Sequence, residues 1–169
     1  MRRILAALSL CIVFATPVYG ESNPLMLPPG GRPIADWIST GLVSANITLD
    51  SIETVKAWRN GDKSRLYNQI CRMGVAIGTT TLVKSAVHRW RPDMSNRESF
   101  WSGHTANAAA SAAPYSSSGK NFSIGVSITV GTAAGRMMAG KHYPTDVIVG
   151  ALDGIAAHYL CGAVAEMHL

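Results

Sequence analysis

Residues 66–92 read LYNQICRMGVAIGTTTLVKSAVHRWRP, and this stretch decides the fold class. Its apolar residues recur mostly at intervals of three, four or seven positions, which is the spacing of a helix with one buried face. These residues are Leu66, Ile70, Met73, Ile77, Val83 and Val87. Proline ends helices because it lacks the backbone N–H donor. The stretch therefore predicts a long, mostly buried helix that stops at Pro92.

The same periodicity continues on both sides of this stretch. It predicts further helices over residues 33–42, 51–58, 103–113, 124–138 and 145–165. Their expected boundaries include Pro33 in a first turn, Asp50 or Ser51 as a cap, and Pro114 as a breaker. The β-branched run 126–130 also fits a strand, but no second strand candidate exists to pair with it. The sequence thus predicts an all-α fold, a compact bundle of about five to six helices.

The chain has 169 residues, of which 47% are apolar and 15% charged. This composition favours one packed domain and excludes a disordered chain or a fibre. Residues 1–20 combine two arginines with an apolar run and a small residue before Glu21, which is typical of a secretory signal peptide. The Pro- and Gly-rich residues 21–32 predict an extended leader, and residues 33–169 a single domain.

A signal peptide predicts a periplasmic protein. The alternative is an uncleaved anchor that holds the protein at the membrane, facing the periplasm, and association with a membrane surface fits either case. Cleavage removes two of the 15 Lys and Arg residues and leaves 13 against 10 Asp and Glu, a formal charge of +3. This bias is too small to indicate a nucleic-acid partner. Cleavage also leaves Cys71 and Cys161 as the only thiols, either as a disulfide or as two buried free cysteines.

Lys84 and Arg91 lie seven residues apart in the first of three clusters that carry chemistry. In a helix this spacing puts both cations on one face, about 10 Å apart along the axis. Two cations on an apolar face need an anion between them. A basic helix C-terminus, favoured by the helix dipole, is the alternative explanation.

The second cluster is Ser102-Gly103-His104, at the expected start of a helix. Backbone N–H groups at a helix start form a cradle for phosphate, and the serine adds a hydroxyl donor. The third cluster holds Arg136, His142 and Asp146. A carboxylate one turn beyond a histidine accepts a hydrogen bond from one ring nitrogen and leaves the other as a nucleophile or base.

Together the three clusters resemble the type 2 phosphatidic acid phosphatases, a superfamily that includes bacterial acid phosphatases and vanadium haloperoxidases. The family pattern is K-x6-R-P, then P-S-G-H, then S-R-x5-H-x3-D. The matching residues are Lys84, Arg91, Pro92, Ser102, Gly103, His104, Arg136, His142 and Asp146. Trp101 replaces the proline of the family pattern and is expected to alter the pocket rim or stack on a substrate. Gly135 replaces the serine of the pattern, so the phosphate contact of that serine hydroxyl is expected to be lost.

The resemblance implies a phosphatase that needs no metal or cofactor and works through a phosphohistidine. Its nucleophile would be His142, oriented by Asp146, with His104 as the acid. The expected phosphate ligands are Lys84, Arg91, Ser102, Gly103 and Arg136. The implied partner is a phosphorylated small molecule or lipid. The alternatives are a vanadate-dependent haloperoxidase and a degenerate member that only binds phosphate.

Overall fold

The computed structural model describes residues 22–117 and 122–168, so the expected signal peptide (1–20) lies outside the described residues. The described residues form a 3-10 turn, η1 (Pro29–Gly31), followed by five α-helices. They are α2 (Arg32–Arg59), α3 (Lys63–Ala86), α4 (Gly103–Ser117), α5 (Phe122–Met138) and α6 (Pro144–His168). The described residues contain no strand, and the predicted all-α bundle is confirmed.

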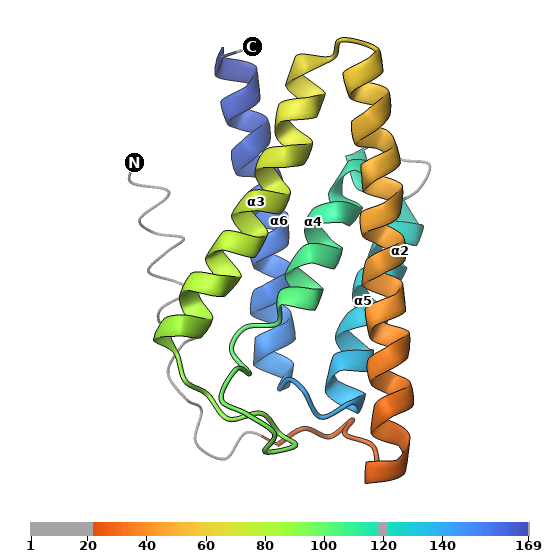
Figure 1. Cartoon of the computed structure of the whole chain (residues 1–169), viewed down its shortest axis with the longest axis vertical. Coiled ribbons are helices and arrows are strands. Elements are labelled where there is room, and N and C mark those ends of the chain that lie inside the picture. The colour runs from red at the N-terminus through yellow and green to blue at the C-terminus, as the bar shows by residue number, and fades with distance from the viewer. Residues whose placement is uncertain (1–21, 118–121, 169) are drawn as a thin grey trace.

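The short helix α4 lies in the middle of the bundle and contacts each of the other four helices (Figure 1). Small residues make this possible. A Cβ atom on Gly150 of α6 would lie 2.5 Å from the carbonyl oxygen of Ser102, and one on Gly154 would lie 2.2 Å from that of Ala106. Only glycine permits such an approach between two helix backbones. The contact fixes the start of α4, which carries His104, against the start of α6, which follows His142.

The predicted break between the first two helices is wrong, because α2 is continuous from Arg32 to Arg59. Residues 43–49 contain neither Gly nor Pro, so nothing interrupts the helix there. Asp50 is not a cap but a buried mid-helix residue, 4% exposed, that forms an ion pair with Arg72 of α3. The break expected at Pro114 is also wrong, because α4 continues to Ser117.

The end of α3 also differs from the prediction. The helix stops at Ala86, and Val87 has extended backbone angles (φ −109°, ψ 100°). The following segment folds back on itself, since the N–H of Arg91 donates to the carbonyl of Asn96 and that of Ser99 to the carbonyl of Arg89. Arg91 therefore lies in a loop (87–102) rather than on the same helix face as Lys84.

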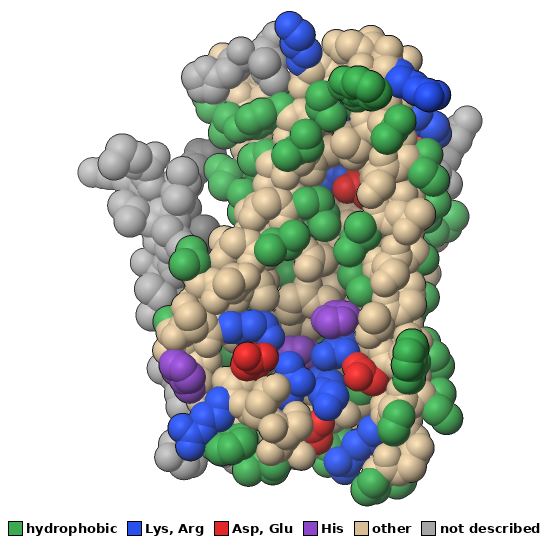
Figure 2. Space-filling model, in the orientation of Figure 1, with side chains coloured by type: hydrophobic (Ala, Val, Ile, Leu, Met, Phe, Trp, Pro, Cys, Tyr) green, Lys and Arg blue, Asp and Glu red, His purple; other side chains and the backbone are tan. Residues whose placement is uncertain are grey.

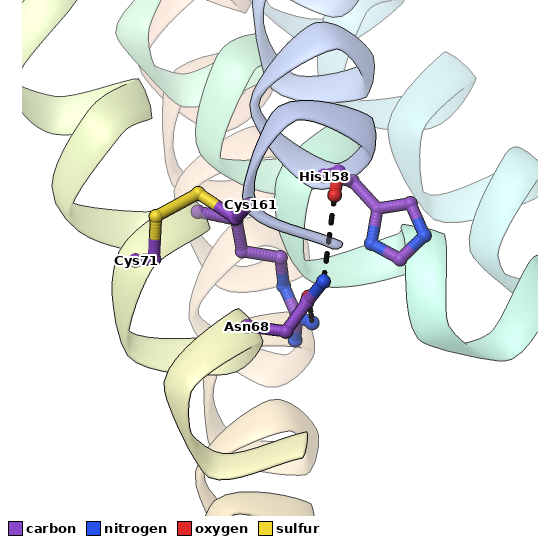
Figure 3. Close-up of a disulfide and its surroundings, with 5 residues drawn as sticks. Asn68, Cys71, His158 and Cys161 are labelled. Carbon is purple, nitrogen blue, oxygen red and sulfur yellow. Dashed lines mark hydrogen bonds between the residues drawn. A yellow bond between two sulfur atoms is a disulfide. The ribbon is translucent and has the colours of Figure 1, made fainter. Parts of the chain in front are cut away.

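Cys71 and Cys161 form a disulfide with a Cα–Cα distance of 5.8 Å, which decides between the two states that the sequence left open. Figure 3 shows it joining α3 to α6, close to Asn68 and His158. The side-chain amide of Asn68 donates to the carbonyl oxygen of His158 at 3.5 Å.

The outer surface of the bundle is unusually apolar. Large apolar side chains are exposed along α2, α3, α5 and α6, among them Trp37, Ile38, Leu82, Val130 and Leu152. Exposed Asp, Glu, Lys and Arg side chains of the described residues lie only at the two ends of the bundle, namely Lys56, Arg59, Asp62, Lys63, Arg65 and Glu166 at one end and Arg97 and Glu98 at the other. The buried positions, in contrast, include Ser39, Asn46, Gln69 and Arg72.

Candidate active site

The candidate site lies at the end of the bundle away from the α2–α3 turn. There Lys and Arg side chains gather with His and acidic side chains (Figure 2). The structure brings together the residues that the sequence placed in three separate clusters. Arg136 and Lys84 are close enough to interact electrostatically with both His104 and His142. Lys84 interacts with Arg91 in the same way.

His142 lies in the short turn between α5 and α6 and is 1% exposed. Its Nδ1 is 2.6 Å from the carbonyl oxygen of Ser99. A carbonyl only accepts hydrogen bonds, so Nδ1 carries the proton and Nε2 keeps its lone pair. The expected hydrogen bond to Asp146 is not the one that holds the ring, because Oδ2 of Asp146 is 3.8 Å from Nδ1. The carbonyl of Ser99, and not the carboxylate of Asp146, therefore fixes the tautomer of His142.

Asp146 sits behind His142 in a dense set of hydrogen bonds. It accepts from the Ser99 hydroxyl, from Nη1 of Arg89 at 2.8 Å and from the backbone N–H of Tyr143 at 2.9 Å. These donors keep the carboxylate ionised and immobile beside the imidazole. Ser99 and Arg89 were missed as site residues. Arg89 lies in the same basic stretch as Lys84 and Arg91, but only the fold of the loop 87–102 shows that its side chain binds Asp146.

Burial lowers the pKa of His142 to about 4, an effect that the neighbouring Asp146 opposes and Arg136 reinforces. The imidazole is therefore neutral at neutral pH, as a nitrogen nucleophile must be.

Each of the three expected phosphate-binding cations contacts a protein oxygen. The Nζ of Lys84 donates to the carbonyl oxygen of Glu98 at 2.8 Å, and Nη2 of Arg91 lies 3.8 Å from the Glu98 carboxylate. Nη1 of Arg136 forms an ion pair with Asp36 of α2. The Nε atoms of Arg91 and Arg136 are buried and have no hydrogen-bond partner. Unpaired buried N–H groups are costly, and an anion in the site would satisfy them.

The Ser102-Gly103 segment begins α4, as expected. The N–H of Ser102, however, donates to the carbonyl of Asp146 at 3.0 Å, so it is already used. The Ser102 hydroxyl caps the helix by accepting from the N–H of Thr105 at 3.3 Å. Its own proton remains available for a phosphate oxygen. Gly103 is required because a Cβ there would lie 2.9 Å from Cγ2 of Thr80.

Comparisons with known proteins identify the family of the chain. The model of the PAP2 superfamily matches residues 68–168, which is more than half of the chain. The chain belongs to the PAP2 superfamily. As a PAP2 member it is a phosphatase, a hydrolase of phosphoric esters. No curated protein sequence matches it.

Two solved structures share the PAP2 fold with this chain. One is the transmembrane PAP2-type phosphatidylglycerolphosphate phosphatase of Bacillus subtilis, with a TM-score of 0.71 and 20% identity over 100% of this chain and 98% of that one. The other is LpxE of Aquifex aeolicus, with a TM-score of 0.57 and 20% identity over 95% of this chain and 94% of that one.

Trp101, the first departure from the PAP2 pattern, is a core residue. It is 4% exposed, packs with Phe100 and Val149, and donates from Nε1 to the hydroxyl of Thr80 at 3.1 Å. The expectation that it alters the pocket rim or stacks on a substrate is therefore wrong.

Gly135, the second departure, lies where α5 crosses α2. A Cβ atom there would be 2.7 Å from Cβ of Ser39 and 3.3 Å from the carbonyl oxygen of Ala35. Restoring the PAP2 serine with Gly135→Ser is thus expected to push α5 away from α2. The free energy of unfolding should fall by an amount typical of overpacking, about 1–3 kcal/mol, and the melting temperature with it. Thermal unfolding in detergent measures this, with Gly78→Ser, where the added Cβ meets nothing within 4 Å, as the control. An unchanged melting temperature with higher kcat/KM would contradict the expectation.

Proposed function

We propose that the protein hydrolyses phosphate monoesters or lipid phosphates and diphosphates through a phosphohistidine on His142, without a metal ion. The hydrogen bond from Nδ1 of His142 to the Ser99 carbonyl carries this proposal. It leaves Nε2 unprotonated next to a cluster of cations that suits a phosphate. Among residues 22–117 and 122–168, no group of three or more His, Cys, Asp or Glu side chains is placed to hold a metal ion.

In the first half-reaction Nε2 of His142 attacks phosphorus, a P–N bond forms and the P–O bond to the leaving alcohol breaks. His104 gives its proton to the departing oxygen. In the second half-reaction neutral His104 takes a proton from water, whose oxygen attacks phosphorus as the P–N bond breaks. Inorganic phosphate leaves, and both histidines return to their starting states.

Lys84, Arg91 and Arg136 hold the three equatorial phosphate oxygens, where charge is spread in the transition state. The proton of the Ser102 hydroxyl adds a fourth donor. The contacts with Glu98 and Asp36 keep the cations in place when no phosphate is bound. A fixed set of cations needs no reorganisation during the reaction.

Two measurements test this function together. Hydrolysis of a phosphate monoester should continue in excess EDTA, because side chains supply all the positive charge. Vanadate, which resembles the five-coordinate transition state, should inhibit it competitively. Loss of activity in EDTA that magnesium or zinc restores would refute the proposal. The variant Glu53→Gln is changed at the end of α2 that lies away from the site. It should respond to EDTA and to vanadate as the wild type does, and it serves as the control.

We further propose that the bundle is embedded in a membrane. The surface between its two charged ends is apolar, and lipid tails are a suitable solvent for it. The helices α2, α3 and α6 contain 28, 24 and 25 residues, and about 20 suffice to cross a bilayer. By hydropathy as well as length, α6 (Pro144–Met167) is a candidate span. Exposed Trp37 and Trp58 lie near opposite ends of α2, as expected at the two membrane interfaces.

This placement differs from the exported periplasmic protein that the sequence predicts, because the helices of the bundle would hold the chain in the membrane, and it favours lipid phosphates as substrates. Because α2 begins at the site end, an exported leader puts the active site on the periplasmic face, where lipid phosphates are within reach. The protein should therefore stay in the membrane pellet after carbonate washing and require detergent for release. N-terminal sequencing then distinguishes a chain that begins at Glu21 from one that retains residues 1–20. Release by carbonate alone would contradict the embedding.

A further inference from the structure

Two residues of α2 reach the candidate site from outside the part of the chain that matches the PAP2 model. Asp36 and Thr40 are four residues apart and thus lie on one face of the helix. The Asp36 carboxylate forms an ion pair with Nη1 of Arg136. The hydroxyl of Thr40 lies 3.5 Å from Nε2 of His104. The face therefore borders both a phosphate-binding cation and the histidine that protonates the leaving group.

Asp36 does not block the phosphate position. It binds Arg136 through Nη1, while the buried Nε on the other edge of the guanidinium has no partner. An arginine offers its Nε and Nη2 donors side by side, so this edge suits two phosphate oxygens. Asp36 lies on the opposite edge, and its side chain is 39% exposed. Its second oxygen, Oδ2, accepts no hydrogen bond from the described residues.

Thr40 indicates what occupies the space beside Asp36. In the proposed mechanism a ring nitrogen of His104 gives its proton to the leaving oxygen, so this oxygen comes within hydrogen-bond reach of that ring. Thr40 contacts Nε2 in the absence of substrate. The alcohol that departs must therefore lie along the face of α2 that carries Thr40 and Asp36.

We propose that Asp36 and Thr40 form a leaving-group subsite that selects phosphate esters whose alcohol carries a second hydrogen-bond donor, a hydroxyl or an ammonium, next to the ester oxygen. The inference rests on the proposed phosphatase function and names the class of its substrate. A carboxylate accepts hydrogen bonds and donates none, so it recognises a donor. An alcohol whose remainder is purely hydrocarbon would remove Oδ2 of Asp36 from water without donating a hydrogen bond to it, which costs free energy.

The test uses two lipid-like esters that differ in one group. One is a dodecyl ether of glycerol 3-phosphate with a free 2-hydroxyl, and the other is its 2-deoxy analogue, both in detergent micelles. The wild type is expected to prefer the hydroxylated ester in kcat/KM. The variant Asp36→Asn should reduce this preference about tenfold, since it removes a charge-assisted hydrogen bond. Thr40→Val should reduce it by a smaller factor, and Glu53→Gln should leave it unchanged.

The ratio of the kcat/KM values for the two esters distinguishes two roles of Asp36, which are binding the leaving group and positioning Arg136. Equal losses on both esters in Asp36→Asn would show that Asp36 only positions Arg136 and would overturn the subsite, as would a wild type without preference. A wild type that hydrolyses neither ester contradicts the phosphatase proposal itself. Vanadate affinity of each variant checks that the phosphate site is intact, because a misfolded site would bind none.

Discussion

Replacing His142 with alanine is expected to abolish the phosphoenzyme and to lower kcat by a factor on the order of 10⁴ or more, as loss of a nucleophile does in other covalent hydrolases. Alanine at this position leaves no nitrogen beside the cations. Rapid quenching after mixing with ³²P-labelled substrate measures the label retained on the protein. The exposed His88, which lies in the loop 87–102, provides a control, and His88→Ala should keep full labelling. Label that persists on His142→Ala would show that another residue attacks phosphorus.

The same experiment distinguishes the second histidine. His104→Ala should form the phosphoenzyme slowly from an alkyl phosphate, whose leaving oxygen needs a proton, and much faster from an aryl phosphate, whose leaving group does not. Equal impairment on both esters would exclude His104 as the acid.

The pH dependence follows from the buried position of His142. Its pKa, lowered to about 4, means that the ring is protonated and unreactive only below that pH. The acid limb of kcat/KM for the free enzyme is therefore expected near pH 4 instead of near 6.5. On the basic side the rate should fall as His104 loses its proton. Burial, reinforced by Arg136, lowers the pKa of His104 in the free enzyme to about 4 as well, so the two limbs of kcat/KM should overlap around that pH and belong to the coupled pair. With the aryl ester, this basic limb should disappear in His104→Ala, while the acid limb stays. An acid limb at pH 6 or above would contradict the environment described for His142.

The second large effect concerns stability. Arg72 and Asp50 form an ion pair in which the two side chains are only 2% and 5% exposed. Replacing Arg72 by leucine leaves Asp50 without its charge partner inside the bundle, which is expected to cost about 3–5 kcal/mol. The double variant Asp50→Leu/Arg72→Leu should recover most of this loss, because two apolar side chains replace the pair. Thermal unfolding in detergent gives both values.

A matched pair at the surface provides the control. Arg65 and Glu53 join the same two helices, but their side chains are 50% and 20% exposed. Arg65→Leu should cost about 1 kcal/mol or less, since solvent screens such pairs. A loss as large as that of Arg72→Leu would mean that burial does not determine the strength of these contacts.

The helices and the motif residues could be predicted from the sequence because both depend on local spacing. Lys84, Arg136 and His142 belong to a pattern of fixed intervals, and the structure brings them to one end of the bundle. The partner of the His142 ring could not be predicted. The spacing of His142 and Asp146 is compatible with a direct hydrogen bond, and only the path of the loop 87–102 places the Ser99 carbonyl closer.

The contribution of α2 to the site could not be predicted from the sequence either. Asp36 lies 100 residues before Arg136, and no motif marks it. The close crossing of α2 and α5 at Gly135 is what brings the two together. The same crossing accounts for the departure at Gly135, which looked like the loss of a phosphate contact. A crossing between two helices that are far apart in the chain produces no periodic pattern of residues, so it cannot be predicted from the sequence.

The disulfide has a consequence for the integrity of the chain. Cys71 and Cys161 are 90 positions apart, and every motif residue from Lys84 to Asp146 lies between them. They close this segment into a covalent ring. A protease that cuts the ring once, at any peptide bond, opens it without releasing a fragment, so the cationic half and the histidine half of the site stay in one molecule. The two pieces separate on a gel only when a reductant is present.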